Sequence, residues 1–148
     1  MQDVRHLKGL SMSRAAFTLK TFAVYLYALG LVLAVSPNLL LTTFGFPSTD
    51  EVWIRVLGLV VINLGAYYWF AAKSEARPFF VASVFTRIFV LFAFTGLAAL
   101  GLAKPMLILF GAIDTVGGLW TLSALRRDRD TQFAPKESSR QARHDAAA

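Results

Sequence analysis

The stretch FFVASVFTRIFVLFAFTGLAALGL, residues 79–102, is followed after Ala103-Lys104-Pro105 by MLILFGAIDTVGGLWTLSAL, residues 106–125. The hydrocarbon core of a bilayer is about 30 Å thick and a helix rises about 1.5 Å per residue, so a membrane-spanning helix needs about 20 apolar residues. Both runs meet this length, and both are apolar on every side. With so short a connection, they predict two antiparallel membrane-spanning helices.

Two further runs of the same kind precede this pair. Residues 17–35 and 52–72 are long and apolar enough to span, and Pro37 ends the first because the residue before a proline disfavours helix. The short loop at residues 73–78 makes the last three spans sequential antiparallel neighbours. The sequence therefore predicts an all-α fold, an integral membrane four-helix bundle with up-down-up-down topology and short loops.

The segment between the first two spans has two distinct parts. Residues 38–46 are too apolar for a solvated loop and too short to span, so we expect them at the membrane interface as a short helix. Ser48 and Glu51 have the S-x-x-E spacing of a capping box, which predicts that they cap the start of the second span.

The composition excludes several classes of function. The 148 residues are 56% hydrophobic and 16% charged, with a mean hydropathy of +0.56, so the excess apolar surface must face something other than water. The absence of cysteine excludes disulfides, thiolate nucleophiles and cysteine-ligated metals. His6 and His144 stand alone in the tails, so we expect no metal site and no cofactor. The net charge of +6 lies in tails and loops, which indicates a membrane surface and no nucleic acid.

Lysine and arginine are distributed unequally between the two sides of the predicted bundle. The N-terminal segment, the loop at residues 73–78 and the C-terminal tail carry nearly all of them, whereas the loop after the first span has none and the third loop has only Lys104. Because basic loops stay in the cytoplasm, we expect a multi-pass protein of the cell inner membrane with both termini cytoplasmic.

The chain divides into three parts on this basis. We predict a cytoplasmic N-terminal segment at residues 1–16, a transmembrane domain at residues 17–125 and a disordered cytoplasmic tail at residues 126–148, whose charges, Gln, Ser and Ala have little to bury. We also expect the first span to be retained, since Pro37 makes a poor context for signal-peptide cleavage.

Polar residues lie deep inside three of the predicted spans, where an ionisable group costs about 2.5 kcal/mol or more. Counted from the predicted cytoplasmic ends, Asn63 and Arg87 lie about 12–14 Å deep and Asp114 about 16–17 Å deep. The difference is less than one helical turn, so these residues can meet if their helices face inward, although counting from the third loop gives a larger stagger. Ser83 and Tyr67, each one turn away, would extend this candidate polar cluster.

Two interpretations of the cluster stay open. Arg87 and Asp114 can pair to fix the packing of their helices, or they can line a small-molecule site or a proton path, as intramembrane charges often do. Gly111, Gly117 and Gly118 share one helical face with Asp114, which predicts that a neighbouring backbone comes close to it.

The remaining polar side chains of the spans are interpreted one by one. Arg55 lies one turn inside the outer boundary, four residues after Glu51, and is expected to extend to the interface. Tyr67 and Tyr68 are typical of an aromatic belt. Tyr25 and Tyr27 lie nearer the middle of their span, and one of them is a further candidate for the polar cluster because a buried hydroxyl needs a partner.

The second span opens with WIRVLGL, residues 53–59. With this arginine, four short-looped spans and basic ends, the chain resembles the small DoxX-like membrane proteins of bacteria over residues 17–125. The resemblance implies a four-helix membrane fold, and DoxX is linked by name to quinone-reducing thiosulfate oxidation. It assigns no catalytic residue to this chain.

The sequence leaves three functions open. The first is a non-enzymatic or accessory inner-membrane protein that binds a lipid-like or quinone-like molecule between its helices. The second is a small transporter or proton path that uses Arg87 and Asp114, as a homo-oligomer because four helices enclose little space. The third is a membrane-embedded enzyme with Asp114 as proton acceptor. The expected partners are the lipid bilayer, such a ligand and further copies of the chain.

Overall fold

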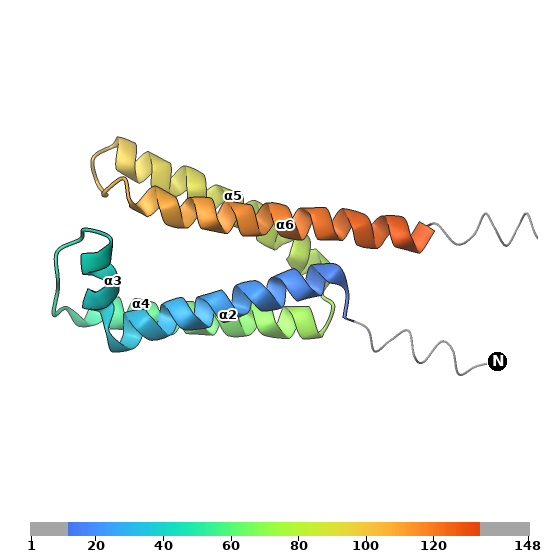
Figure 1. Ribbon diagram of the computed structural model, residues 1–148, viewed down its shortest axis with the longest axis horizontal. Helices are drawn as coiled ribbons and strands as arrows, with labels where there is room; N and C mark the ends of the chain where they lie inside the picture. The colour runs from blue at the N-terminus through green and yellow to red at the C-terminus, as the bar shows by residue number, and fades with distance from the viewer. Residues whose placement is uncertain (1–11, 134–148) are drawn as a thin grey trace, which may run out of the picture.

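The structure, a computed structural model, describes residues 12–133. These residues form helices and no strand (Figure 1). The elements are α2 (Arg14–Val35), α3 (Pro37–Thr43), α4 (Val52–Lys73), α5 (Arg77–Ala99) and α6 (Leu107–Phe133). Four of them, all except α3, are long and apolar enough to cross a membrane. The predicted all-α membrane four-helix bundle is therefore confirmed.

Large apolar side chains cover the outside of the bundle. Phe85, Phe89 and Phe92 of α5, for example, are all exposed on the protein surface. Exposed apolar surface on this scale is unfavourable in water. It is what a helix requires when it faces lipid, so the outer surface of the bundle contacts the bilayer.

The bundle consists of two helical hairpins, α2 with α4 and α5 with α6, which diverge toward the end that carries α3 (Figure 1). Glycine allows the close approach within each hairpin. A Cβ atom at Gly58 would lie 2.5 Å from the backbone nitrogen of Ala34 and 2.7 Å from the carbonyl oxygen of Gly30. A Cβ atom at Gly111 would lie 2.8 Å from the Cα atom of Leu91. Small residues of this kind let membrane helices pack backbone to backbone.

The expectation that all of the last three spans pack as sequential neighbours is wrong for one pair. α4 and α5 make few contacts although a short loop joins them, and the hairpins meet mainly through α2 and α6. Bulky side chains of α4 and α5, including Leu64, Tyr68 and Phe79, border a pocket between these two helices. This pocket lies where α4 and α5 remain apart.

At the basic end of the molecule, where α2 begins and α6 ends, polar side chains form hydrogen bonds with the start of α2. Ser13 accepts a hydrogen bond from the backbone N–H of Ala16 (3.0 Å) and donates through its own hydroxyl to Glu75 (2.6 Å). The carboxylate of Asp128 accepts the backbone N–H of Ala15 (3.0 Å). These acceptors satisfy amides that a helix start leaves free.

The prediction of a disordered tail is wrong for the residues around Asp128. Helix α6 continues to Phe133, so residues 126–133 are helical and not disordered. Hydropathy marks where a span leaves the membrane, whereas the helix itself continues because Arg126, Arg127 and Arg129 are good helix formers and Asp128 is fixed to α2. The remainder of the predicted tail, residues 134–148, and residues 1–11 of the N-terminal segment lie outside the described residues.

At the opposite end, the predicted short helix after the first span is confirmed as α3. The ring of Phe44, which follows α3, lies 4.8 Å from that of Phe110 in α6, measured between centroids. Lys104, between α5 and α6, donates a hydrogen bond to the carbonyl oxygen of Gly45. The segment after α3 therefore bridges the two hairpins at the end where they diverge.

The predicted capping box is wrong. Helix α4 begins at Val52, and Glu51, its N-cap residue, makes no capping hydrogen bond with its side chain. The carboxylate of Glu51 accepts the indole N–H of Trp53 instead, and the extended backbone before Glu51 places Ser48 outside the helix.

Arg55 is exposed, as its expected interfacial position requires. Its guanidinium donates hydrogen bonds to the carbonyl oxygens of Ala34 (2.7 Å) and Val35 (2.9 Å). These are terminal carbonyls of α2, where a cation is favoured by the helix dipole. Arg55 therefore connects the start of α4 to the end of α2.

Candidate functional site

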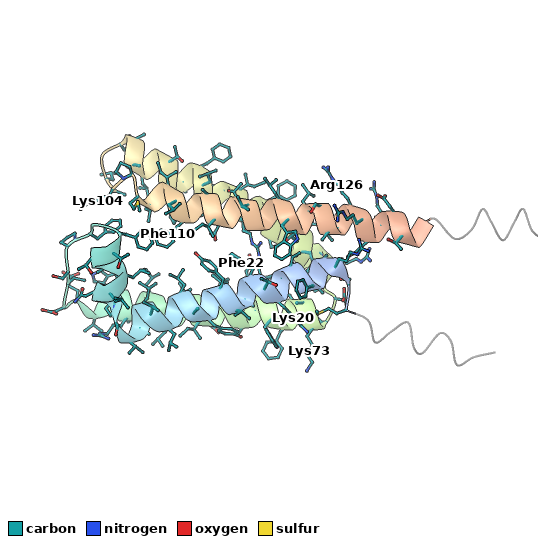
Figure 2. All side chains as sticks on the ribbon, viewed as in Figure 1. Lys20, Phe22, Lys73, Lys104, Phe110 and Arg126 are labelled. Carbon is teal, nitrogen blue, oxygen red and sulfur yellow. The ribbon has the colours of Figure 1, made fainter. Side chains whose placement is uncertain are left out.

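Arg87 occupies the point where the two hairpins meet. Its side chain is 2% exposed. The guanidinium carbon lies 3.5 Å from the ring centroid of Phe22 in α2 and 5.0 Å from that of Tyr68 in α4, and Nη1 lies 3.5 Å from the hydroxyl of Thr121 in α6. Each of the four long helices thus contributes to the surroundings of one cation, with Phe22 lying between the hairpins (Figure 2).

The hydrogen bonding of Arg87 is incomplete. Nε and Nη2 are buried and have no hydrogen-bond partner among the described residues. The aromatic rings offset part of the cost of burying the charge, but they do not accept the remaining N–H groups as a carbonyl or carboxylate would. Buried donors without partners are rare in proteins and call for an explanation.

Asp114 lies level with Arg87 but does not bond to it. Gly111 packs against Leu91 and Gly118 against the side chain of Arg87, so the antiparallel register places Asp114 beside residues 87–88. Helical side chains tilt toward the N-terminus of their own helix. In antiparallel helices they diverge, and Arg87 accordingly extends toward Thr121 at the basic end. Asp114 makes no hydrogen bond or ion pair with the described residues and remains half-buried.

Two adjacent cavities lie beside these charges. The first, which we name the arginine pocket, has a volume of about 340 Å³ and lies between the hairpins beside α4 and α5. Its lining includes Ser83, Arg87 and Asp114. The second, the apolar cleft, has a volume of about 420 Å³ and extends toward α3. Leu26, Leu64, Val90 and Asp114 line both cavities, so the two lie next to each other.

The walls of the apolar cleft are almost entirely hydrocarbon. All the long helices contribute, together with α3 and the residues after it, and Asp114 is the charged residue in the lining. Representative lining residues are Leu29, Leu33, Leu41, Phe44, Trp53, Phe94 and Phe110. The arrangement combines a long apolar space with a cation and a carboxylate at one end.

The structure brings together three of the five residues of the predicted cluster. Ser83, Arg87 and Asp114 line the arginine pocket, and the hydroxyl of Ser83 donates to the carbonyl oxygen of Phe80 (2.8 Å). Asn63 and Tyr67 do not join them, because both are exposed on the outside of α4 and Tyr67 is 59% exposed. Of the two further candidates, Tyr25 lines the apolar cleft, whereas the ring of Tyr27 lies against Gly65 of α4.

The close packing predicted for one face of the fourth span is confirmed. A Cβ atom at Gly117 would lie 3.3 Å from Nη1 of Arg87, and one at Gly118 would lie 3.4 Å from the Cβ atom of Arg87. These glycines leave room for the arginine side chain to lie along α6. The backbone that comes close to α6 at Gly111 and Gly118 is that of α5.

Sequence reasoning missed Tyr68 and Phe22 as partners of Arg87. Tyr68 was expected in the aromatic belt beside Tyr67, but it is 5% exposed and packs inward. A signal for this existed, since Gly65, Tyr68 and Ala72 recur at helical spacing and all three are buried. No comparable signal distinguishes Phe22 among the 13 phenylalanines of the chain.

Comparison with protein-family models, with curated proteins and with solved structures finds no match for this chain.

Proposed function

We propose that this membrane protein binds one long-chain amphiphile, lipid-like or quinone-like, between its hairpins and acts as an accessory protein, not as an enzyme. The observation that carries the proposal is Arg87, a buried cation with two nitrogens that lack hydrogen-bond partners among the described residues, beside two adjacent and mainly apolar cavities. Ligand sites in proteins commonly combine apolar walls with a few polar groups that fix orientation.

The polar groups match the chemistry of such a head group. Arg87 offers donors to a quinone carbonyl, an ester or a phosphate, and Asp114 offers an acceptor to a hydroxyl such as that of a reduced quinone. Phe22 covers the guanidinium, so its ring would have to move to admit the head group. The hydrocarbon chain would then occupy the apolar cleft, and the ligand would enter from the bilayer between α4 and α5, which make few contacts.

A tryptophan placed in the cleft is expected to expel the ligand. Leu29 of α2 lines the apolar cleft, whereas Leu31 of the same helix is 57% exposed on the lipid-facing side. Protein extracted in mild detergent should carry the amphiphile, identified by native mass spectrometry and by organic extraction. Leu29→Trp should lower its occupancy by at least about tenfold because it fills the cavity. Leu31→Trp should leave the occupancy unchanged.

Two results would contradict the proposal. One is wild-type protein that carries no amphiphile above the general lipid background. The other is Leu29→Trp protein that remains folded by circular dichroism and retains as much ligand as Leu31→Trp.

We further propose that the basic end faces the cytoplasm and that the membrane is the cell inner membrane. The support is the charge distribution, with Lys73 and Arg126 at the end where α2 begins and Lys104 at the other (Figure 2).

Because the chain has no cysteine, single introduced cysteines can test this orientation without background labelling. An impermeant maleimide added to intact spheroplasts should label Ser48→Cys and should not label Ser74→Cys, since both positions are exposed and lie at opposite ends. The reverse pattern would overturn the orientation.

One observation favours the alternative of a small oligomeric transporter or proton path. The hydroxyl of Thr18 lies 3.0 Å from that of Thr121, which contacts Arg87, so a line of polar groups leads from the basic end to the arginine pocket. Asn63, exposed in the middle of α4, could bond to a second copy. Flux in proteoliposomes would distinguish transport from binding. An enzyme with Asp114 as proton acceptor, and kinship with the DoxX-like proteins, remain hypotheses.

A further inference from the structure

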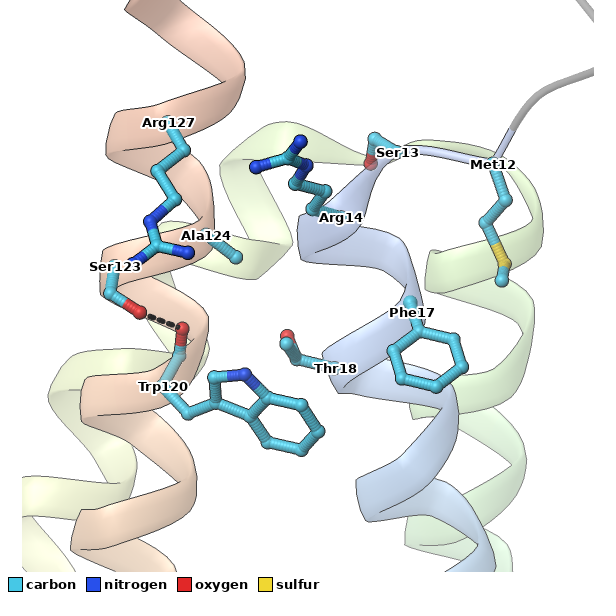
Figure 3. A pocket seen from close by; sticks show the side chains of 9 residues that line it. All are labelled: Met12, Ser13, Arg14, Phe17, Thr18, Trp120, Ser123, Ala124 and Arg127. Carbon is cyan, nitrogen blue, oxygen red and sulfur yellow. Dashed lines mark hydrogen bonds between the residues drawn. The ribbon is translucent and has the colours of Figure 1, made fainter.

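A third cavity lies at the basic end, apart from the arginine pocket and the apolar cleft. It has a volume of about 590 Å³ and opens between the first turns of α2 and the last turns of α6 (Figure 3). Its lining includes Arg14, Phe17, Thr18, Trp120, Ser123 and Arg127. None of these residues lines the arginine pocket or the apolar cleft.

The charge of this pocket is positive and is not neutralised by a described residue. Arg14 and Arg127 extend from opposite walls, and neither guanidinium group forms an ion pair or hydrogen bond with another described residue (Figure 3). The nearby acidic side chains are engaged elsewhere: Asp128 accepts the backbone N–H of Ala15, and Glu75 accepts the hydroxyl of Ser13. The two guanidinium groups are therefore not engaged by these described acidic side chains.

The lower part of the pocket is amphipathic. The ring of Phe17 lies 6.3 Å from that of Trp120 in an edge-to-face arrangement, and both side chains are about half exposed. The indole nitrogen of Trp120 faces the basic side of the pocket (Figure 3). Tryptophan prefers the boundary between headgroups and hydrocarbon, so the pocket lies where the membrane changes from polar to apolar.

We propose that this pocket binds the headgroup of an anionic phospholipid. Arg14 and Arg127 would hold the phosphate, with planar donors suited to its oxygens, while the hydroxyl of Ser123 and the indole N–H of Trp120 would contact the glycerol region. Ser123 currently donates to the carbonyl oxygen of Trp120 (2.7 Å), a bond that leaves its lone pairs free. The acyl chains would lie along Phe17 and the apolar surface below it. Basic pockets between membrane helices bind lipid headgroups in this way.

The test compares lipids that differ only in headgroup. Purified full-length protein should bind phosphatidylglycerol more tightly than phosphatidylcholine of the same acyl chains, measured by native mass spectrometry. The variant Arg14→Gln with Arg127→Gln should lower the affinity for phosphatidylglycerol by about tenfold or more, since each basic group near a membrane surface contributes measurably to anionic lipid binding. Its affinity for phosphatidylcholine should not change.

The matched control removes the same charge from the same end. Arg77→Gln with Arg126→Gln changes two exposed arginines that do not line the pocket, and it should retain the affinity for phosphatidylglycerol. An equal loss in both double variants would show general attraction of anions to a basic surface and would overturn the proposal. Equal binding of the two lipids by wild type would overturn it too. Displacement of phosphatidylglycerol by millimolar inorganic phosphate would assign the pocket to a free anion instead.

Discussion

Gly58→Ala is expected to destabilise the folded protein by about 2–3 kcal/mol, although alanine is the better helix former by about 1 kcal/mol. The added methyl group would lie 2.5 Å from the backbone nitrogen of Ala34 and 2.7 Å from the carbonyl oxygen of Gly30. Neither is the end of a flexible side chain, so the contact cannot be relieved by a rotamer change. Helices α2 and α4 would have to separate, and the apolar cleft that they border would change shape.

Gly96 of α5 supplies the control for this substitution. A Cβ atom there would meet nothing within 4 Å, so Gly96→Ala should leave stability unchanged or raise it by up to about 1 kcal/mol. Reversible unfolding in mixed detergent micelles measures both variants. If Gly58→Ala and Gly96→Ala are equally stable, then α2 and α4 do not cross at Gly58.

This crossing also shows why helix pairing was the part of the fold that sequence reasoning predicted least well. Span length and loop length are local properties, and both were sufficient to predict four antiparallel membrane helices. The choice of neighbour depends on which small residues face each other across two helices. Gly58 faces Gly30, and Gly111 faces Leu91, but no pattern within a single helix specifies the partner. The loop between α4 and α5 therefore suggested a contact that the helices barely make.

The depth of the candidate site residues in the membrane could be predicted from the sequence, but the direction in which their side chains point could not. Counting along the helices placed Arg87 and Asp114 within one turn of each other, and the contacts of Gly111 and Gly118 agree with that register. The two side chains nevertheless diverge, because each tilts toward the start of its own antiparallel helix. Asn63 lies at a similar predicted depth but on the outer face of α4. A depth count contains no information about which way a helix is rotated.

Arg87→Met should abolish most amphiphile binding while leaving the protein folded. The substitution loses the contacts with Phe22 and Tyr68, which contribute about 1–2 kcal/mol. It also removes a buried charge with unpaired donors, which costs about 1–3 kcal/mol or more, so the net change in stability should lie within about 1 kcal/mol. Ligand occupancy should fall about 10- to 100-fold, as expected for the loss of a charge-assisted hydrogen bond.

The control for Arg87→Met is Lys20→Met, which removes a cation from α2. Lys20 lines neither cavity, and its ammonium group lies 5.4 Å from the ring centroid of Trp69. Lys20→Met should retain the ligand. If Arg87→Met unfolds the protein, while its folded fraction binds the ligand normally, Arg87 serves packing alone and the proposed binding function loses its main support.

A double-mutant cycle between Arg87→Met and Asp114→Asn separates packing from ligand binding. Without ligand, the coupling between the two changes in unfolding free energy should be smaller than that of a direct ion pair, because the side chains diverge. With the amphiphile bound, the coupling should rise, since one head group would then contact both residues and each change would alter the contribution of the other. Strong coupling in the ligand-free protein would instead indicate a direct Arg87–Asp114 pair. Weak coupling in both states would show that the two charges do not share a ligand.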